Sequence, residues 1–140
     1  MILRSVEPVN FGPFATRTTL LVEPEVTVLT GANDTGKSTL LRLIRVICTG
    51  GVADERDYNR FRMGAFAGSW QEDPDFGCAV TFELSESSKD YLSGPQYQPG
   101  DRLSFFVCLS PQRRQLLMVE LRRGDKKMAL LPTEWVKNRV

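Results

Sequence analysis

Histidine is absent from this 140-residue chain, and no run of apolar residues is long enough to cross a bilayer as a helix. Without histidine, Ser-His-Asp and Cys-His nucleophilic catalysis and the usual histidine metal sites are excluded. The first residues show no basic head followed by an apolar stretch, so we expect no secretory signal. Cysteine is scarce, and Cys48, Cys78 and Cys108 match no zinc or redox spacing. We expect them to be small core residues of a reduced, cytoplasmic protein.

The composition is otherwise that of one ordinary globular domain, with 41% hydrophobic and 25% charged residues. The net charge of +1 conceals an uneven distribution. Residues 1–51 carry five Lys or Arg and four Asp or Glu, residues 52–100 carry four and nine, and residues 101–140 carry nine and four. This balance does not imply attraction of the whole protein to nucleic acid, but it predicts a local basic face in the last third.

Strand signals alternate with turns over the first thirty residues. Residues 2–9 and 16–22 predict strands, and Pro8 confines the first of them to an edge or to a strand end. Residues 26–30 (VTVLT) are β-branched and mostly apolar, which is typical of a strand covered on both faces. Such a strand needs neighbours on both sides, so the sequence predicts an incompletely paired sheet edge unless another chain covers it.

Residues 31–38 (GANDTGKS) match the phosphate-binding pattern G-x-x-x-x-G-K-[ST] without mismatch. The predicted strand before them and a helical pattern over residues 36–49 supply the context that this motif requires. The helix is expected to be largely buried, because its polar residues fall on one narrow stripe. Gly50-Gly51 is expected to end it. The sequence therefore predicts a strand–loop–helix nucleotide site, and the alternative is a glycine-rich turn that binds nothing.

The residue types of this loop suit phosphate chemistry. Glycines at 31 and 36 let the backbone approach a ligand closely, and successive N–H groups then form an anion nest at the positive end of the helix. Lys37 is expected to reach the β- and γ-phosphates in a catalytic role, and Ser38 to ligate Mg²⁺. The predicted nucleotide-binding residues are Gly31, Ala32, Asn33, Asp34, Thr35, Gly36, Lys37, Ser38 and Thr39.

The remainder of the chain predicts an irregular charged segment followed by antiparallel strands. Apolar residues alternate from residue 78 onward, and Gly124-Asp125 marks a two-residue hairpin turn. A short helix capped by Ser85 is expected over residues 85–92. The predicted divisions are residues 1–51 (phosphate-loop core), 52–77 (irregular charged segment), 78–131 (antiparallel β meander) and 132–140 (C-terminal tail).

The segment NFGPF, two strands and then VTVLTGANDTGKSTLLRLI resemble the N-terminal lobe of ABC-class P-loop ATPases of the SMC and RecF type, in particular OLD-family nucleases. The loops of those proteins look like G-x-N-[GDN]-[ST]-G-K-S-[TN]-L, and the strong resemblance covers residues 1–50. It implies an α/β P-loop NTPase fold with an incomplete sheet. It also implies a protein that binds ATP and Mg²⁺, dimerises head to head and acts on DNA in repair, chromosome handling or phage defence. The matching residues are Asn33, Gly36, Lys37, Ser38, Thr39 and Leu40.

Several catalytic elements of those relatives are missing from the sequence. No apolar strand ends in Asp-Glu, so Mg²⁺ lacks a second protein anchor and the attacking water lacks its base. Residues 92–96 (LSGPQ) resemble the signature sequence and residues 116–120 (LLMVE) a Walker B strand. We interpret both as chance matches, because Pro95 prevents a helix from starting and the strand lacks its Asp.

The simplest interpretation is therefore one lobe of a larger ATPase, which hydrolyses ATP only when other segments complete it. The expected partners are ATP, the rest of the ATPase or a second copy, and DNA through the basic C-terminal third, with no membrane. One alternative is a non-hydrolysing nucleotide-binding or dimerisation module. Another is a small P-loop kinase or GTPase, although the sequence has no Asn-Lys-x-Asp guanine motif.

Other residues carry two interpretations each. Phe11 and Phe14 lie where the relatives place residues near adenine or ribose, but packing onto the core is preferred. Three arginines after the helix are read as solvated loop charges, although SMC-type relatives place there an arginine that can approach phosphate or DNA; they are Arg56, Arg60 and Arg62. Six basic residues either contact a phosphate backbone or, as we prefer, protect a sheet edge; they are Arg113, Arg114, Arg122, Arg123, Lys126 and Lys127. Trp70 and Trp135 are expected to pack in a core or an interface.

Overall fold

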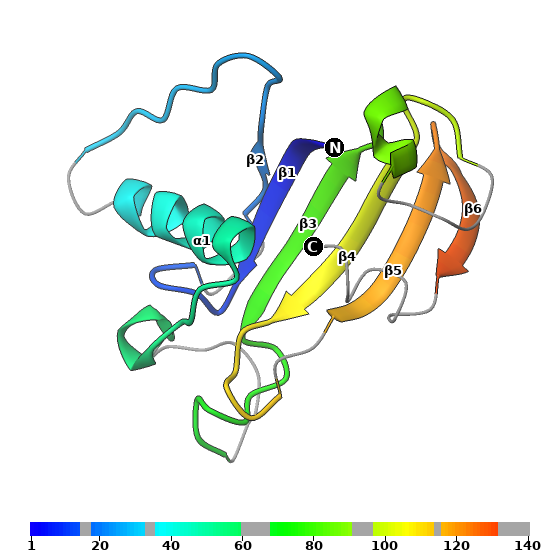
Figure 1. Ribbon diagram of the computed structural model, residues 1–140. Coiled ribbons are helices and arrows are strands. Elements are labelled where there is room, and N and C mark those ends of the chain that lie inside the picture. The colour runs from blue at the N-terminus through cyan, green and yellow to red at the C-terminus, as the bar shows by residue number, and fades with distance from the viewer. Residues whose placement is uncertain (15–17, 33–35, 60–67, 91–96, 114–115, 132–140) are drawn as a thin grey trace.

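In the residues that it describes, the computed structural model is a six-stranded antiparallel sheet with one α-helix against one face (Figure 1). The strand order is β2–β1–β3–β4–β5–β6, and all neighbouring pairs are antiparallel. The elements are β1 (Ile2–Val9), β2 (Leu20–Leu21), α1 (Lys37–Thr49), the 3-10 helix η1 (Glu55–Asp57), β3 (Gly77–Glu83), the 3-10 helix η2 (Glu86–Asp90), β4 (Arg102–Cys108), β5 (Leu116–Arg123) and β6 (Lys126–Leu131). The structure describes residues 1–14, 18–32, 36–59, 68–90, 97–113 and 116–131.

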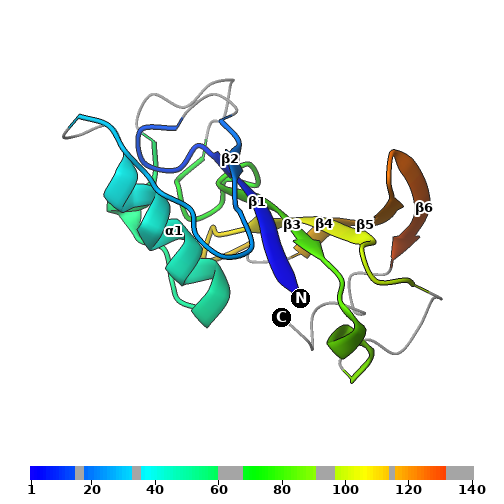
Figure 2. The same ribbon diagram turned by 90° about the horizontal axis from the view of Figure 1, so that it is seen from above.

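The predicted meander is confirmed by strands β3 to β6. Every second residue of a strand points to the same face of the sheet. The register sets Val6 of β1 beside Val80 of β3, and Val80 beside Phe105 of β4. All three side chains are buried, so this row of residues is part of the hydrophobic core. The β5–β6 turn holds Gly124 at a φ of 57°, a left-handed conformation that glycine adopts without strain. Seen from above, α1 lies on one face and β6 bends away from it (Figure 2).

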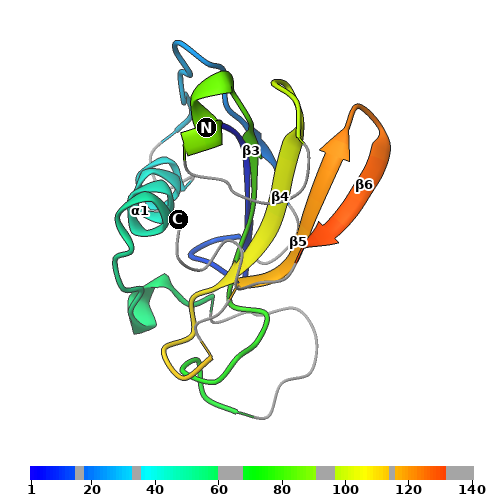
Figure 3. The same cartoon turned by 45° about the vertical axis from the view of Figure 1, so that its right-hand side comes forward.

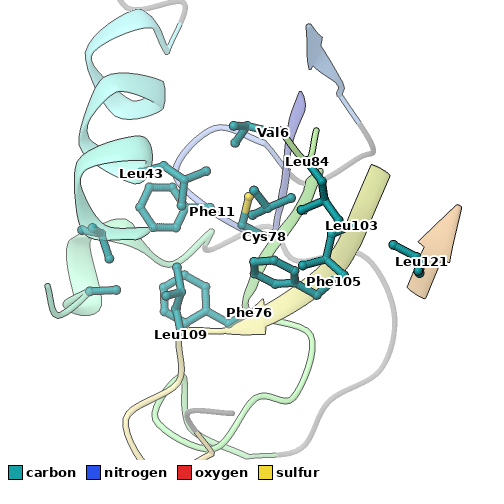
Figure 4. Close-up of a cluster of buried hydrophobic side chains, with 13 residues drawn as sticks. Val6, Phe11, Leu43, Phe76, Cys78, Leu84, Leu103, Phe105, Leu109 and Leu121 are labelled. Carbon is teal, nitrogen blue, oxygen red and sulfur yellow. The ribbon is translucent and has the colours of Figure 1, made fainter. Parts of the chain in front are cut away.

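An aromatic group links the sheet to the turn that follows β1. Phe76 is fully buried, stacks on Phe11 at 5.8 Å between ring centroids, and meets Tyr58 and Trp70 edge-on at 5.2 and 6.4 Å. Leu43 of α1 lies beside Phe11 in this core (Figure 4). Buried apolar contacts of this kind supply most of the stabilisation of a domain. The buried apolar cluster comprises Val6, Phe11, Leu43, Val46, Ala53, Phe76, Cys78, Val80, Leu84, Leu103, Phe105, Leu109 and Leu121.

The prediction of a covered strand over residues 26–30 is wrong. Residues 22–32 arch away from the sheet (Figure 1) and form no strand, and Val26 and Val28 are 71% and 74% exposed. The physical reason is the lack of neighbours. A strand buried on both faces needs partner strands on each side. In the described sheet the six strands pair with one another, and none of them pairs with residues 26–30.

The burial predicted for α1 is also wrong in part. Only Leu43 and Val46 are buried, whereas Leu41 is 59% exposed, because a single sheet covers a single stripe of the helix. The helix ends as expected at Gly50, which has a φ of 66° and donates from its backbone N–H to the carbonyl of Val46. Cys48 lies on the exposed side, so the expectation that all three cysteines are core residues holds only for Cys78 and Cys108. Burial raises the pKa of the Cys78 thiol to about 12.

Three local predictions need smaller corrections. Within residues 18–22 only the two residues of β2 are a strand, and residues 16–17 lie outside the described ranges. The helix expected over residues 85–92 is the 3-10 helix η2, and the Ser85 hydroxyl bonds to the hydroxyls of Ser87 and Ser88. Residues 91–96 and the predicted tail 132–140, with Trp135, lie outside the described part of the chain. No helix in the described ranges has the length and hydropathy needed to cross a membrane.

Candidate nucleotide-binding site

The phosphate loop leads directly into α1, as the motif predicts. Gly36 is the residue before the helix and has a φ of 98°, which a side chain would strain. Its carbonyl accepts the first helical hydrogen bond, from the Leu40 N–H at 2.9 Å. No side chain caps this end of α1 in the described structure, and the first turn has no acidic residue. The first N–H groups of the helix therefore present partial positive charge to an anion.

Lys37 folds its side chain over the loop that precedes it. The Nζ atom donates to the carbonyl of Gly31 and, at 2.7 Å, to the carbonyl of Ala32. The side chain of the first residue of α1 thus bonds back to the first two residues of the loop. Ser38 is exposed and Thr39 half-buried. Asn33, Asp34 and Thr35 of the predicted set lie outside the described residues. An ammonium group, helix N–H groups and an exposed hydroxyl are a donor set that fits a polyphosphate with its metal ion.

The turn at residues 10–14 forms a wall against this loop. A Cβ atom placed on Gly36 would lie 2.6 Å from Cζ of Phe14 and 2.9 Å from Cγ of Pro13. A Cβ atom on Gly12, which has a φ of 54°, would overlap the Thr39 side chain. Both glycines are therefore required by close approach. The structure separates the two phenylalanines of this turn, because Phe11 is fully buried and Phe14 lies half-buried against the loop.

An ion pair that the sequence reasoning missed ties α1 to the segment of η1. The Arg42 guanidinium donates from Nε to Oδ1 of Asp57 at 2.6 Å and from Nη2 to Oδ2 at 2.9 Å. Asp57 is buried, and its Oδ2 also accepts the Asp54 N–H at 2.9 Å. These side-chain hydrogen bonds raise the pKa of Arg42. The pattern Asp54-x-x-Asp57 resembles a capping box and was the available signal, although it does not reveal the arginine partner.

The basic residues singled out in the sequence do not form one surface. Arg113 precedes β5, whereas the turn that joins β5 to β6 follows the other end of that strand (Figure 1). Arg56 pairs with Asp54 at 2.9 Å, while Arg60, Arg62 and Arg114 lie outside the described residues. Figure 3 shows the β5–β6 hairpin at the edge of the sheet that is farther from α1.

The hairpin places its cations on two faces. Arg123 makes two hydrogen bonds of 2.8 Å to the buried Asp101, and this pairing holds the pKa of Asp101 below its ordinary value. On the opposite face Glu120 pairs with Arg122 and with Lys127. The pairing supports the interpretation of a charged hairpin at a sheet edge. Glu120 also lies inside β5, which pairs with β4 and β6 in antiparallel ladders. This position agrees with the interpretation that residues 116–120 match a Walker B strand by chance.

An intact G-x-x-x-x-G-K-[ST] motif that leads into a helix at a left-handed glycine, with its lysine bonded to the start of the loop, is typical of a P-loop nucleotide-binding domain. Comparison with protein families agrees: the family model described as AAA domain matches residues 6–123. The chain therefore belongs to the AAA domain family. This match confirms the P-loop ATPase class expected from residues 31–38, and with it an ATP-binding ATPase domain.

Two further comparisons complete the picture. No curated protein matches the chain. Solved structures do match, including one described as "Structural biochemistry of ATP-driven dimerization and DNA stimulated activation of SMC ATPases". That structure is similar at 18% identity with a TM-score of 0.48, and the match covers 92% of this chain and 73% of the other.

Proposed function

We propose that the chain binds Mg-ATP at residues 31–39 as the nucleotide-binding lobe of an ATPase. The observation that carries the proposal is the Lys37 ammonium, which extends from the uncapped start of α1 to the carbonyls of Gly31 and Ala32. A triphosphate in the loop would accept hydrogen bonds from Lys37 and from the loop N–H groups, those of Asn33, Asp34, Thr35 and Thr39 included. Ser38 would ligate the Mg²⁺ ion, which neutralises phosphate charge when bound.

Hydrolysis is proposed only for the completed ATPase. The sequence supplies no strand ending in Asp-Glu, and Glu120, the acidic end of the strand most like one, is engaged by Arg122 and Lys127. A water molecule beside the γ-phosphate would then need a base from another segment or from a second copy. The alternative of a non-hydrolysing nucleotide-binding module rests on the same observation. Turnover of Mg-ATP by the protein after its partner is added separates the two.

The partner surface is proposed to be the apolar side of the phosphate-loop region. Val26, Val28 and Leu41 are each more than half exposed and come from consecutive parts of the chain around the loop. Strands pairing with residues 26–30 would cover them, whether they come from the rest of the ATPase or from a second copy. Sedimentation with and without Mg-ATP tests the second source directly, because a head-to-head dimer forms only when nucleotide is present.

A role on DNA, in repair, chromosome handling or phage defence, is the finer part of the proposal. The register sets Arg102 opposite Arg122 and Arg122 opposite Lys127, so three cations lie in one row across neighbouring strands. Like charges placed opposite each other are unfavourable unless an anion compensates them. Glu120 compensates two of them, and Arg102 has no ion pair within the described residues. DNA binding that weakens steeply with salt and is reduced by Arg102→Ala would support this role.

Titration of the protein with Mg-ATP tests nucleotide binding itself. Lys37→Ala is expected to weaken binding about a hundredfold, because hydrogen bonds to a charged group contribute about 3 kcal/mol at most. The matched control is Arg45→Ala, an exposed cation on the same helix, which should bind as tightly as the wild type. Circular dichroism should show both variants folded. Equal affinity of Lys37→Ala and wild type, or no wild-type binding, would contradict the proposal.

A further inference from the structure

The strongest unexplained feature is the Arg42–Asp57 pair, neither residue of which belongs to the phosphate-binding motif. Arg42 lies on α1 five positions after Lys37, and its guanidinium is 44% exposed. Its partner carboxylate is only 7% exposed. Two parallel hydrogen bonds to a buried carboxylate fix the geometry of both partners, and a lone surface ion pair would not do so.

The backbone of the Asp57 segment holds the turn that follows β1. The Gly12 N–H donates to the Asp57 carbonyl at 2.6 Å, and the Asn59 N–H donates to the Asn10 carbonyl at 2.9 Å. Phe11 and Tyr58 form a β-bridge between these two hydrogen bonds. The turn at residues 10–14 is therefore attached to the segment that Arg42 holds.

The same turn packs against the start of α1. Pro13 and Phe14 fill the space beside Gly36, and Gly12 approaches the side chain of Thr39. Arg42 is therefore linked to the start of its own helix through a chain of contacts. The chain runs from Arg42 to Asp57, then to the turn at residues 10–14, and from this turn to Gly36. Every link in this chain of contacts is a hydrogen bond, an ion pair or a close van der Waals contact, so a change at one link displaces the others.

We infer that Arg42 and Asp57 are positioning residues for the nucleotide site. The pair holds the turn at residues 10–14 as a wall of the phosphate loop and thereby fixes the direction of the first N–H groups of α1. This inference rests on the proposed binding of Mg-ATP, because the wall has a role only if the loop takes a ligand. Ligand-binding groups lose affinity when their supporting partners are removed, commonly by about ten- to a hundredfold.

Conservative variants test the pair. Arg42→Lys keeps the charge that compensates Asp57 but cannot form the two parallel hydrogen bonds. Asp57→Asn keeps an acceptor for the Asp54 N–H but removes the charge. Each variant is expected to bind Mg-ATP about tenfold more weakly than the wild type. Arg45→Lys, the same exchange three positions along α1 at an exposed arginine, is the matched control and should bind normally.

Hydrogen exchange at the Gly12 amide gives a readout that a purely structural role would not produce. In the wild type, Mg-ATP should slow exchange at Gly12, although its acceptor lies outside the loop, because coupling between two sites is reciprocal. In both variants Gly12 should exchange faster before any nucleotide is added. Failure of the wild type to bind Mg-ATP would overturn the proposed function. Wild-type binding that leaves Gly12 exchange unchanged, or unaltered affinity in both variants, would overturn this inference alone.

Discussion

The sheet and the phosphate-loop region of this domain differ in how completely they are packed. In and next to the sheet, Val80 of β3, Leu103 of β4 and Phe76, which directly precedes β3, are at most 1% exposed. The phosphate-loop region leaves Val28, which lies between β2 and α1, and Leu41 of α1 largely exposed. The difference shows that the antiparallel strands complete their own core, whereas the phosphate-loop region is covered on one side only and leaves apolar side chains of the other side exposed.

The largest expected effect comes from deleting the aromatic centre of the packed region. Phe76→Ala removes a fully buried ring that contacts Phe11, Tyr58 and Trp70, and it should lower the free energy of unfolding by about 3–5 kcal/mol. Urea unfolding measures the loss. Phe106→Ala, at a half-buried ring of β4, is the control and should cost clearly less. Equal losses would show that the packed region is not centred where the structure places it.

A smaller effect is expected at the far edge of the same core. Arg123, through its hydrogen bonds, lowers the pKa of Asp101, so the pair contributes stability above the ordinary pKa of an aspartate. That contribution is lost as the pH falls through the lowered pKa of the folded state. Asp101→Asn should therefore cost about 1–2 kcal/mol near neutral pH, since Arg123 is partly solvated.

Unfolding at two pH values checks this prediction. The difference in stability between wild type and Asp101→Asn should narrow as the pH falls from about 7 to below the ordinary aspartate pKa, toward the lowered pKa of the folded wild-type carboxyl. A difference that stays constant over this range would mean that the ion pair does not stabilise the hairpin.

The smallest expected effect distinguishes the two regions most simply. Val28→Ser changes an exposed side chain and should alter the free energy of unfolding by less than about 0.5 kcal/mol. Val80→Ser, the same exchange at a residue that is 1% exposed, should be strongly destabilising because it creates a cavity and buries a hydroxyl group. A loss above about 1 kcal/mol at Val28 would mean that residues 26–30 are already covered in solution.

The contrast between these regions also explains which parts of the fold the sequence predicted. The strands of the meander follow from alternation and from the Gly124-Asp125 turn, both of which are local signals. Residues 26–30 have an equally clear local pattern, yet the pattern reports a preference for burial and not the presence of neighbours. The exposed side of α1 has the same cause, because an apolar helix face shows what it can bury but not what is there to cover it.

The candidate site divides in a similar way. Gly36, Lys37 and Ser38 were predictable, because the motif encodes both their spacing and their chemistry. The contact of Phe14 with Gly36 was not, because it joins residues 22 positions apart through a turn whose direction only the fold defines. The Arg42–Asp57 pair was equally hidden, since its partners lie 15 positions apart on separate elements.

Hydrogen exchange of the loop amides with and without Mg-ATP tests the central claim most directly. If residues 31–39 hold the triphosphate, their N–H groups should exchange more slowly with saturating Mg-ATP, while exchange in β3 and β4 stays unchanged. Lys37→Ala should abolish the protection at the same nucleotide concentration. Unchanged exchange over residues 31–39 in the wild type at saturating Mg-ATP would contradict the claim that this loop is the nucleotide site.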